Sequence, residues 1–196
     1  MVSACSELTD EYSGAIEFFS ECISRRPDDV AAHLYLGAAL WYSGELEKAN
    51  DVFSRALLLS PQDSNLLSSR GQILVEIGEY DKALCDLEGC LQHADIASAL
   101  EEGPKVALRA YALSGRGAAY SGLGKLEAAQ KDFNESLALC PKNAWVYYNM
   151  ALACERQGDI DAAIRNYTIS LKMREPKLNA SKRTAALARL GILQPS

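Results

Sequence analysis

Apolar residues recur along the chain at helical spacing, in segments that stop at glycine or proline. The segment ELEKANDVFSRALLLSP carries one apolar stripe with steps of three, four, three and one: Leu46, Ala49, Phe53, Ala56 and Leu57. The segment before it, VAAHLYLGAALWYSG, also has apolar residues on one helical face and ends at Gly44. Glycine supplies the backbone freedom for a tight turn, and Pro61 cannot continue a helix. The pattern therefore predicts two antiparallel helices over residues 30–60.

The same pattern occurs five times. Copies of the second helix begin at Asp10, Gly44, Gly78, Gly124 and Gly158, at separations of 34, 34, 46 and 34 residues. A small residue recurs on the first helix, at Gly37, Gly71, Gly117 and Ala151. On the second helix a small residue is followed four positions later by a large one, at Phe19, Phe53, Leu87, Phe133 and Tyr167. Close helix packing at a fixed period predicts an all-α solenoid of stacked helical hairpins.

At these residues the chain resembles the tetratricopeptide repeat (TPR) family over roughly residues 10–175. The resemblance implies a right-handed α-solenoid of antiparallel helix hairpins with a C-terminal capping helix, in one domain over 1–196. The expected units are a partial N-terminal repeat (1–29), repeats over 30–63, 64–109, 110–143 and 144–177, and a capping helix over 178–193. Arg70 departs from the family pattern, because a large apolar residue is usual there.

Three segments do not fit a plain repeat. The repeat over 64–109 has about 12 extra residues, which we interpret as a helix continuing past His93 towards Glu102, a stop at Gly103 and a long helix from Pro104. Residues 1–8 align with the second half of a first helix, so the chain is expected to begin inside a repeat. The capping helix is expected to turn Leu187 and Leu190 inward and Lys182 and Arg189 towards water.

Composition narrows the class of function. The net charge is −6, which argues against nucleic acid as the main partner. Seven basic residues nevertheless lie in residues 164–196 beside Glu175 alone. The six cysteines form no C-x-x-C pair and are interpreted as reduced thiols, most of them in the core. No secretory signal or membrane span is predicted, so we expect a cytoplasmic protein.

No catalytic or metal-binding constellation is predicted. The chain has two histidines, His33 and His93, and neither has a Cys, Ser or carboxylate at a spacing that suggests nucleophilic or metal chemistry. His33 stands where the family has a core-facing aromatic, which favours a packed histidine. We therefore expect a non-enzymatic chain without cofactor or metal.

The resemblance implies a concave groove lined by the first helix of each repeat. Its expected lining is aromatic at both ends, small and hydroxylated in the middle, and poor in charge. The candidate partner-binding residues are Tyr35, Ala38, Trp41, Tyr42, Ser69, Gln72, Tyr111, Ser114, Trp145, Tyr148, Asn149, Leu152 and Arg156. Tyr and Trp are common binding anchors, and small residues leave room for a peptide or a helix. The alternative for Trp145 and Tyr148 is that they pack between repeats.

The sequence thus predicts a protein–protein interaction scaffold that binds a peptide or helix of a partner in this groove. Chaperone-binding TPR domains hold a C-terminal carboxylate with Lys, Asn and Arg, and the matching positions here lack that set, so binding of Hsp70 or Hsp90 tails is disfavoured. The alternative function is a structural subunit that assembles into a homo-oligomer or a larger complex. The extension near residues 95–109 and the basic C-terminal end are further candidate partner surfaces.

Overall fold

The computed structural model describes residues 3–97, 104–173 and 180–193, and these residues form helices and no strand. In chain order the helices are α1 (Ser3–Arg25), α2 (Val30–Ser43), α3 (Leu46–Leu59), α4 (Ser64–Ile77), α5 (Tyr80–Ala97), α6 (Pro104–Gly122), α7 (Leu126–Leu139), α8 (Ala144–Arg156), α9 (Ile160–Lys172) and α10 (Ala180–Leu193).

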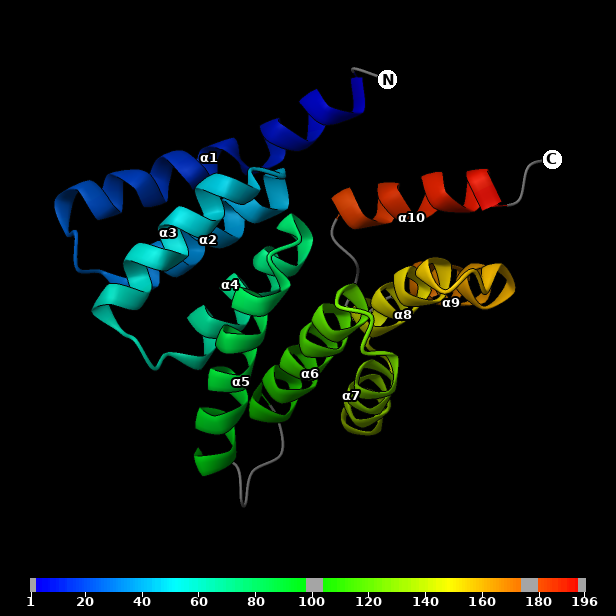
Figure 1. Cartoon of the computed structure of the whole chain (residues 1–196). Coiled ribbons are helices and arrows are strands. Elements are labelled where there is room, and N and C mark those ends of the chain that lie inside the picture. The colour runs from blue at the N-terminus through cyan, green and yellow to red at the C-terminus, as the bar shows by residue number, and fades with distance from the viewer. Residues whose placement is uncertain (1–2, 98–103, 174–179, 194–196) are drawn as a thin grey trace.

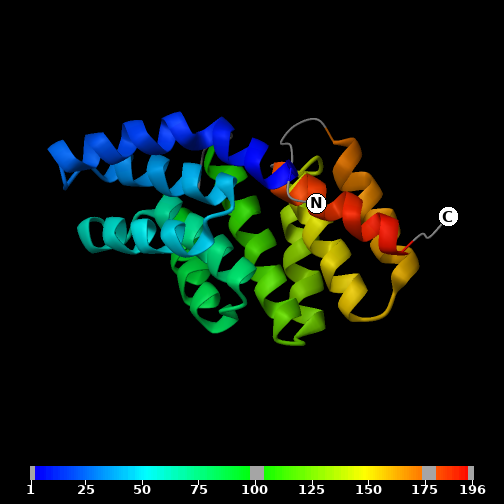
Figure 2. The same ribbon diagram turned by 90° about the horizontal axis from the view of Figure 1, so that it is seen from above.

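Consecutive helices pair as antiparallel hairpins, α2 with α3, α4 with α5, α6 with α7 and α8 with α9. Figure 1 shows the hairpins following an arc from α1 to α9, with α10 across the open side of that arc. The view from above shows the same stack, with successive hairpins side by side (Figure 2). The predicted all-α solenoid of helical hairpins is confirmed.

Turn chemistry explains where the helices begin and end. Gly44 and Gly78 end α2 and α4 with φ of 91° and 93°, in the left-handed region where a side chain would be strained. The same two helices, α2 and α4, begin after aspartates that cap backbone amides. The Asp29 carboxylate accepts from the Ala32 amide at 2.9 Å, and that of Asp63 accepts from the Leu66 amide at 3.1 Å.

In the hairpins α2–α3, α4–α5 and α6–α7 the small residue of the first helix faces the large residue of the second. A methyl group added at Gly37 would lie 2.6 Å from Cζ of Phe53, and one at Gly71 would lie 2.7 Å from Cγ of Leu87. Gly117 has the same relation to Phe133. Phe53 and Leu87 are fully buried. The repeated small–large pattern therefore sets the close approach of the two helices.

The extension in the repeat over 64–109 agrees with the prediction where it is described, whereas the N-terminal segment differs from it. Helix α6 begins at Pro104, as expected, and α5 continues past His93 to Ala97. The rest of the expected extension, residues 98–103, lies outside the described residues. Helix α1 corrects the N-terminal expectation, because it is one continuous helix without a turn near Asp10. Asp10 stands where the other copies have a turn glycine, so the chain lacks the residue that favours a left-handed break there.

The orientation of α10 is a second correction. Lys182 is 7% exposed and points into the molecule, whereas Leu187 is 54% exposed. Arg189 remains about half exposed and Leu190 half-buried. The inversion arises because Lys182 has an ionic partner and two aromatic faces inside the arc, described below, which outweigh the apolar preference of Leu187.

The structure also tests the expected packing of His33 and of the cysteines. His33 is 4% exposed and its Nδ1 lies 2.9 Å from the Asp29 carbonyl oxygen, which confirms a packed histidine. Cys22, Cys85, Cys90, Cys140 and Cys154 are free thiols, and of these five Cys90 alone is fully buried, which raises its pKa to about 11. Cys85 is exposed and Cys22, Cys140 and Cys154 are half-buried, so the expectation that most of the cysteines lie in the core was wrong.

Candidate interaction surface on the inner face of the arc

The inner face is lined by α2, α4, α6 and α8, and its centre is filled by aromatic rings. Trp41 of α2 and Trp145 of α8 lie with ring centroids 5.5 Å apart, although α2 belongs to the first complete hairpin and α8 to the last. Tyr111 of α6 packs edge-on against Trp145 at 5.6 Å. The array thus curves tightly enough for its first and last hairpins to meet.

A single carboxylate oxygen beside these rings has two partners. Trp41 Nε1 donates a hydrogen bond of 2.8 Å to Oε1 of Glu76, and Nζ of Lys182 lies 2.8 Å from the same oxygen. The Lys182 ammonium also lies 5.2 Å from the ring centroid of Trp145 and 5.0 Å from that of Tyr148. Glu76, Trp145 and Tyr148 therefore surround this ammonium, and we call these three residues the lysine cage.

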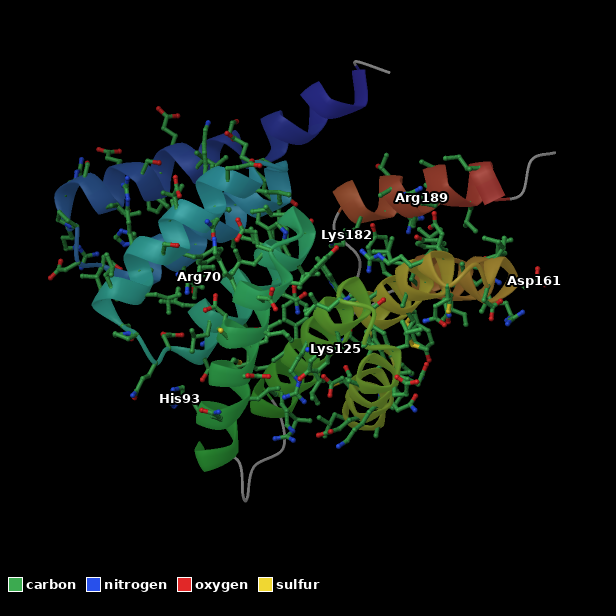
Figure 3. The ribbon with its side chains drawn as sticks, in the orientation of Figure 1. Arg70, His93, Lys125, Asp161, Lys182 and Arg189 are labelled. Carbon is green, nitrogen blue, oxygen red and sulfur yellow. The ribbon has the colours of Figure 1, made fainter. Side chains whose placement is uncertain are left out.

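Lys182 enters the lysine cage from α10. Figure 3 shows it between α10 and the central helices, with Arg189 farther along the same helix. One turn after Lys182, Ala186 is fully buried. Arg189 Nη1 lies 3.1 Å from Oε1 of Glu155, and Arg183 donates to the Leu171 carbonyl at 3.3 Å. Helix α10 thus packs against α9 and α2, and reaches the inner face through the buried Lys182 and the Arg189–Glu155 pair.

A cavity of about 210 Å³ adjoins the lysine cage. Its lining comes from α4, α5, α6, α8 and α10: Val75, Glu76, Tyr80, Ala118, Tyr148, Asn149, Leu152, Arg156 and Lys182. Arg156 Nη2 donates to the Tyr80 hydroxyl at 3.3 Å, and its guanidinium lies 5.9 Å from the Tyr80 ring centroid. Exposed Arg156 and half-buried Leu152 form an accessible rim of the inner face beside α10.

Two amide side chains tie neighbouring helices of the inner face together. Gln72 Nε2 of α4 donates to the Tyr111 carbonyl of α6 at 2.9 Å. Asn149 Nδ2 of α8 donates to Ser114 Oγ of α6 at 3.0 Å. Gln72, Asn149 and Ser114 are buried, so these hydrogen bonds fix the spacing of the first helices.

The thirteen candidate residues fall into three groups by exposure. Six are buried: Trp41, Gln72, Ser114, Trp145, Tyr148 and Asn149. Five are half-buried: Ala38, Tyr42, Ser69, Tyr111 and Leu152. Two are exposed, Tyr35 and Arg156. Tyr35 stacks on Phe19 of α1 with centroids 5.2 Å apart, away from the lysine cage. For Trp145 and Tyr148 the sequence left two alternatives, exposure in the groove or packing between repeats. Both rings are buried, as expected for packing.

The phenol groups of the inner face stay neutral well above neutral pH. Burial and, second, the charge of Glu76 raise the pKa of Tyr148 to about 12. Burial is also the main cause that raises the pKa of Tyr111 well above its usual value. These rings therefore act as neutral packing and cation-binding surfaces.

A repeated ion pair was missed in the sequence. Arg70 of α4 forms two hydrogen bonds of 2.7 Å with the Asp86 carboxylate of α5, and Arg116 of α6 pairs in the same way with Asp132 of α7. Asp86 and Asp132 are buried. A signal was present: each arginine stands in the position of Leu36 in the first complete repeat, and each has an aspartate sixteen residues later. The departure at Arg70 is thus compensated within its own hairpin.

No group of three or more His, Cys, Asp or Glu residues in the described parts of the chain is arranged to hold a metal ion. No described helix has the length and apolar character needed to cross a membrane.

The chain is similar to known helical-repeat proteins. Tetratricopeptide repeat models match residues 9–73 and 108–176. A TPR repeat-containing protein of Methanocaldococcus jannaschii is 27% identical over 85% of this chain and 29% of its own length. The Hsp70-Hsp90 organizing protein of Triticum aestivum is 35% identical over 55% of this chain and 16% of its own length. The chain thus spans less than a third of these curated relatives.

Solved structures share the fold. A crystal structure of MamA superposes with a TM-score of 0.60 at 18% identity, covering 96% of this chain and 98% of that one. The Cut9 complex with Hcn1 gives a TM-score of 0.69 at 16% identity, covering 95% of this chain and 33% of that one. TPR proteins generally mediate protein–protein interactions, and such solenoids are typically non-enzymatic scaffolds. The two repeat-model matches together cover more than half of the chain, which belongs to the tetratricopeptide repeat family.

Proposed function

We propose that this chain is a non-enzymatic scaffold that binds a helix or peptide of a partner protein on the inner face of its arc. The observation that carries the proposal is α10. Helix α10 packs against α9 and already places a side chain on the inner face, where Lys182 is buried between Glu76 of α4 and Trp145 and Tyr148 of α8. A surface that holds the buried cation of one helix has the chemistry to bind that of another.

The candidate residues divide into two roles under this proposal. The half-buried and exposed rim, above all Leu152 and Arg156 beside the 210 Å³ cavity, offers direct contact to a partner. The buried residues, such as Asn149 and Gln72, hold the first helices at the right spacing through their hydrogen bonds. Substituting a buried residue would therefore disturb the scaffold as well as the binding surface.

Binding of a chaperone tail through a carboxylate clamp is not part of the proposal. The wheat relative is named as an Hsp70-Hsp90 organizing protein, but a clamp needs Lys, Asn and Arg on successive first helices. The matching positions here are Leu34, Ala38, Ser69, Tyr111 and Gly115, or, one repeat later, Ser68, Gln72, Gly115, Trp145 and Asn149. Neither set offers a cation to a carboxylate.

The experiment is affinity capture from source-cell lysate with three full-length baits: the wild type, Arg156→Glu and Lys131→Glu. Lys131 is exposed on α7, on the outer side of its hairpin, and its substitution changes the net charge by the same amount. A partner retained by the wild type and by Lys131→Glu, but lost by Arg156→Glu, supports the inner face. Capture that is equal with all three baits, or absent with all three, contradicts the proposal.

A further inference from the structure

The lysine cage has the chemistry of a receptor site for an ammonium group. The Glu76 carboxylate supplies the counter-charge at 2.8 Å, and the rings of Trp145 and Tyr148 present two aromatic faces to the same cation. Lysine is a compact point charge on a long apolar stem, and in the structure that stem carries the ammonium from α10 to this site. The hydrogen bond from Trp41 Nε1 holds the carboxylate in place independently of Lys182.

The present occupant is attached through few groups. Helix α10 packs on α9, and among its residues 182–192 the small Ala186 is the fully buried side chain besides Lys182, while Leu187 and Ile192 are 54% and 67% exposed. The Arg189–Glu155 pair is half exposed on the arginine side, so it contributes little. By contrast, every hairpin buries a large side chain such as Phe53, Leu87, Phe133 or Tyr167. Helix α10 therefore undocks at a lower free energy than the hairpins unfold.

We infer that the lysine cage receives a lysine side chain carried on an amphipathic helix of a partner protein, and that α10 occupies the site until that helix displaces it. This inference rests on the proposed function. It adds the class of partner, a lysine-bearing helix, and the element that blocks the site, α10. Because α10 and the partner helix compete for one site, binding of the partner is weakened by the fraction of chains in which α10 is docked.

The side chains that α10 turns inward indicate which residues a competing helix needs on its binding face. Lys182, Ala186 and Leu190 follow one another at steps of four and lie on the inner side of α10 as buried, buried and half-buried residues. A partner helix therefore needs a lysine, a small residue one turn later and an aliphatic residue after two turns. Glu155 lies farther along the path of α10 and favours a second basic residue, as Arg189 now provides.

The test uses a fluorescent synthetic peptide of residues 178–193 as the probe and full-length proteins as receptors. The receptors are the wild type, Lys182→Ala and the double variant Lys182→Ala with Glu76→Gln. The control probe is the same peptide with Lys182→Met. Circular dichroism and thermal unfolding first verify that the variants keep the hairpins folded, which is expected because α10 lies outside them.

We expect the lysine peptide to bind Lys182→Ala about tenfold more tightly than the wild type, because the resident helix is loosened there. The Met peptide should bind Lys182→Ala about tenfold more weakly than the lysine peptide, and the double variant should no longer distinguish the two peptides. The lysine peptide, but not the Met peptide, should also compete with the partner captured through the Arg156 surface.

Equal binding of the two peptides to Lys182→Ala, or no binding of either, would overturn the inference. The proposed function would survive that result if capture still depended on Arg156, so the two failures can be told apart. Light scattering adds a further check. If the wild type, which keeps Lys182, forms a dimer that excess lysine peptide dissociates, the site belongs to α10 of a second copy of this chain, and the partner assignment falls.

Discussion

The ammonium of Lys182 lies 2.8 Å from the carboxylate of Glu76, and this contact joins the C-terminal helix α10 to α4 in the second complete hairpin. It reverses the orientation that the apolar pattern of α10 predicts, since the lysine is inside and Leu187 outside. A burial of this kind is tolerated only when the charge is paired, and the aromatic faces of Trp145 and Tyr148 complete the pairing.

Removal of the carboxylate should therefore release α10. In Glu76→Gln the Lys182 ammonium would lose its counter-charge. Burying an unpaired charge costs free energy, and undocking of α10 would return the ammonium to water. We expect faster amide hydrogen exchange throughout Ala180–Leu193 and a loss of about 2 kcal/mol in the free energy of docking. Glu155→Gln is the control, because its arginine partner is half exposed, and its effect should stay below about 1 kcal/mol. Equal exchange in the two variants would refute the role of Glu76.

Replacing both Arg70 and Asp86 by apolar residues should preserve most of the stability, whereas removing only one of the two charges should lower it. Arg70→Ala leaves Asp86 buried without its partner and should lower the free energy of unfolding by about 2–3 kcal/mol. The double variant Arg70→Leu with Asp86→Val introduces the pair found in the first complete repeat, Leu36 and Val52, and should recover most of that loss.

Urea unfolding measures these differences, with Lys48→Ala as the control. The Lys48 side chain is 72% exposed and pairs with Glu45 on the surface, so less than about 0.5 kcal/mol should be lost. A double variant no more stable than Arg70→Ala would show that the hairpin requires the charges themselves.

Replacement of glycine by alanine should have opposite effects on stability at Gly37, which packs against a ring, and at Gly14, which does not. Gly37→Ala would place a methyl group 2.6 Å from the Phe53 ring, and the overpacking should cost about 1–3 kcal/mol. Gly14→Ala, in the exposed part of α1 with nothing within 4 Å, should stabilise the chain by up to about 1 kcal/mol through helix propensity. Thermal unfolding of both variants checks the signs, and two shifts in the same direction would contradict the packing account.

Alkaline pH should weaken the inner face through Tyr148. Burial first and the Glu76 charge second raise the pKa of Tyr148 to about 12, from an ordinary value of 10.0. The folded chain thus holds this proton more tightly, so the resulting stabilisation is complete below pH 10 and is lost as the pH rises towards 12. Tyr148→Phe should make the fall in unfolding free energy over this window shallower, by at most about 1.4 kcal/mol per pH unit. Identical slopes for wild type and variant would contradict this.

Local features of the fold could be predicted because they depend on residues within one repeat. Gly44 and Gly78 mark turns by their backbone conformation, and Gly37 faces Phe53 within one hairpin. The contact of Trp41 with Trp145 could not be predicted in the same way. It depends on small rotations between successive hairpins that add up over the array, and no spacing in the sequence encodes their sum.

The same reasoning explains the errors at the two ends of the chain. Helix α1 is continuous because Asp10 replaces the turn glycine, so the repeat period alone predicts a turn that the local residue does not favour. The orientation of α10 depends on Glu76 in a distant repeat, and a pattern that treats lysine as a surface residue misses such a partner. Pairing of Arg70 with Asp86 was readable, since Arg116 and Asp132 repeat the spacing.

The most direct measurement is hydrogen exchange followed by NMR on the ¹⁵N-labelled full-length wild type, with and without a saturating amount of the unlabelled peptide of residues 178–193. If α10 occupies a site that another lysine-bearing helix can take, exchange at Ala180–Leu193 of the protein should accelerate, while the amides of α5 and α7 on the outer side remain unchanged. Unchanged exchange in α10 at saturation would show that the peptide binds elsewhere, and would contradict the account.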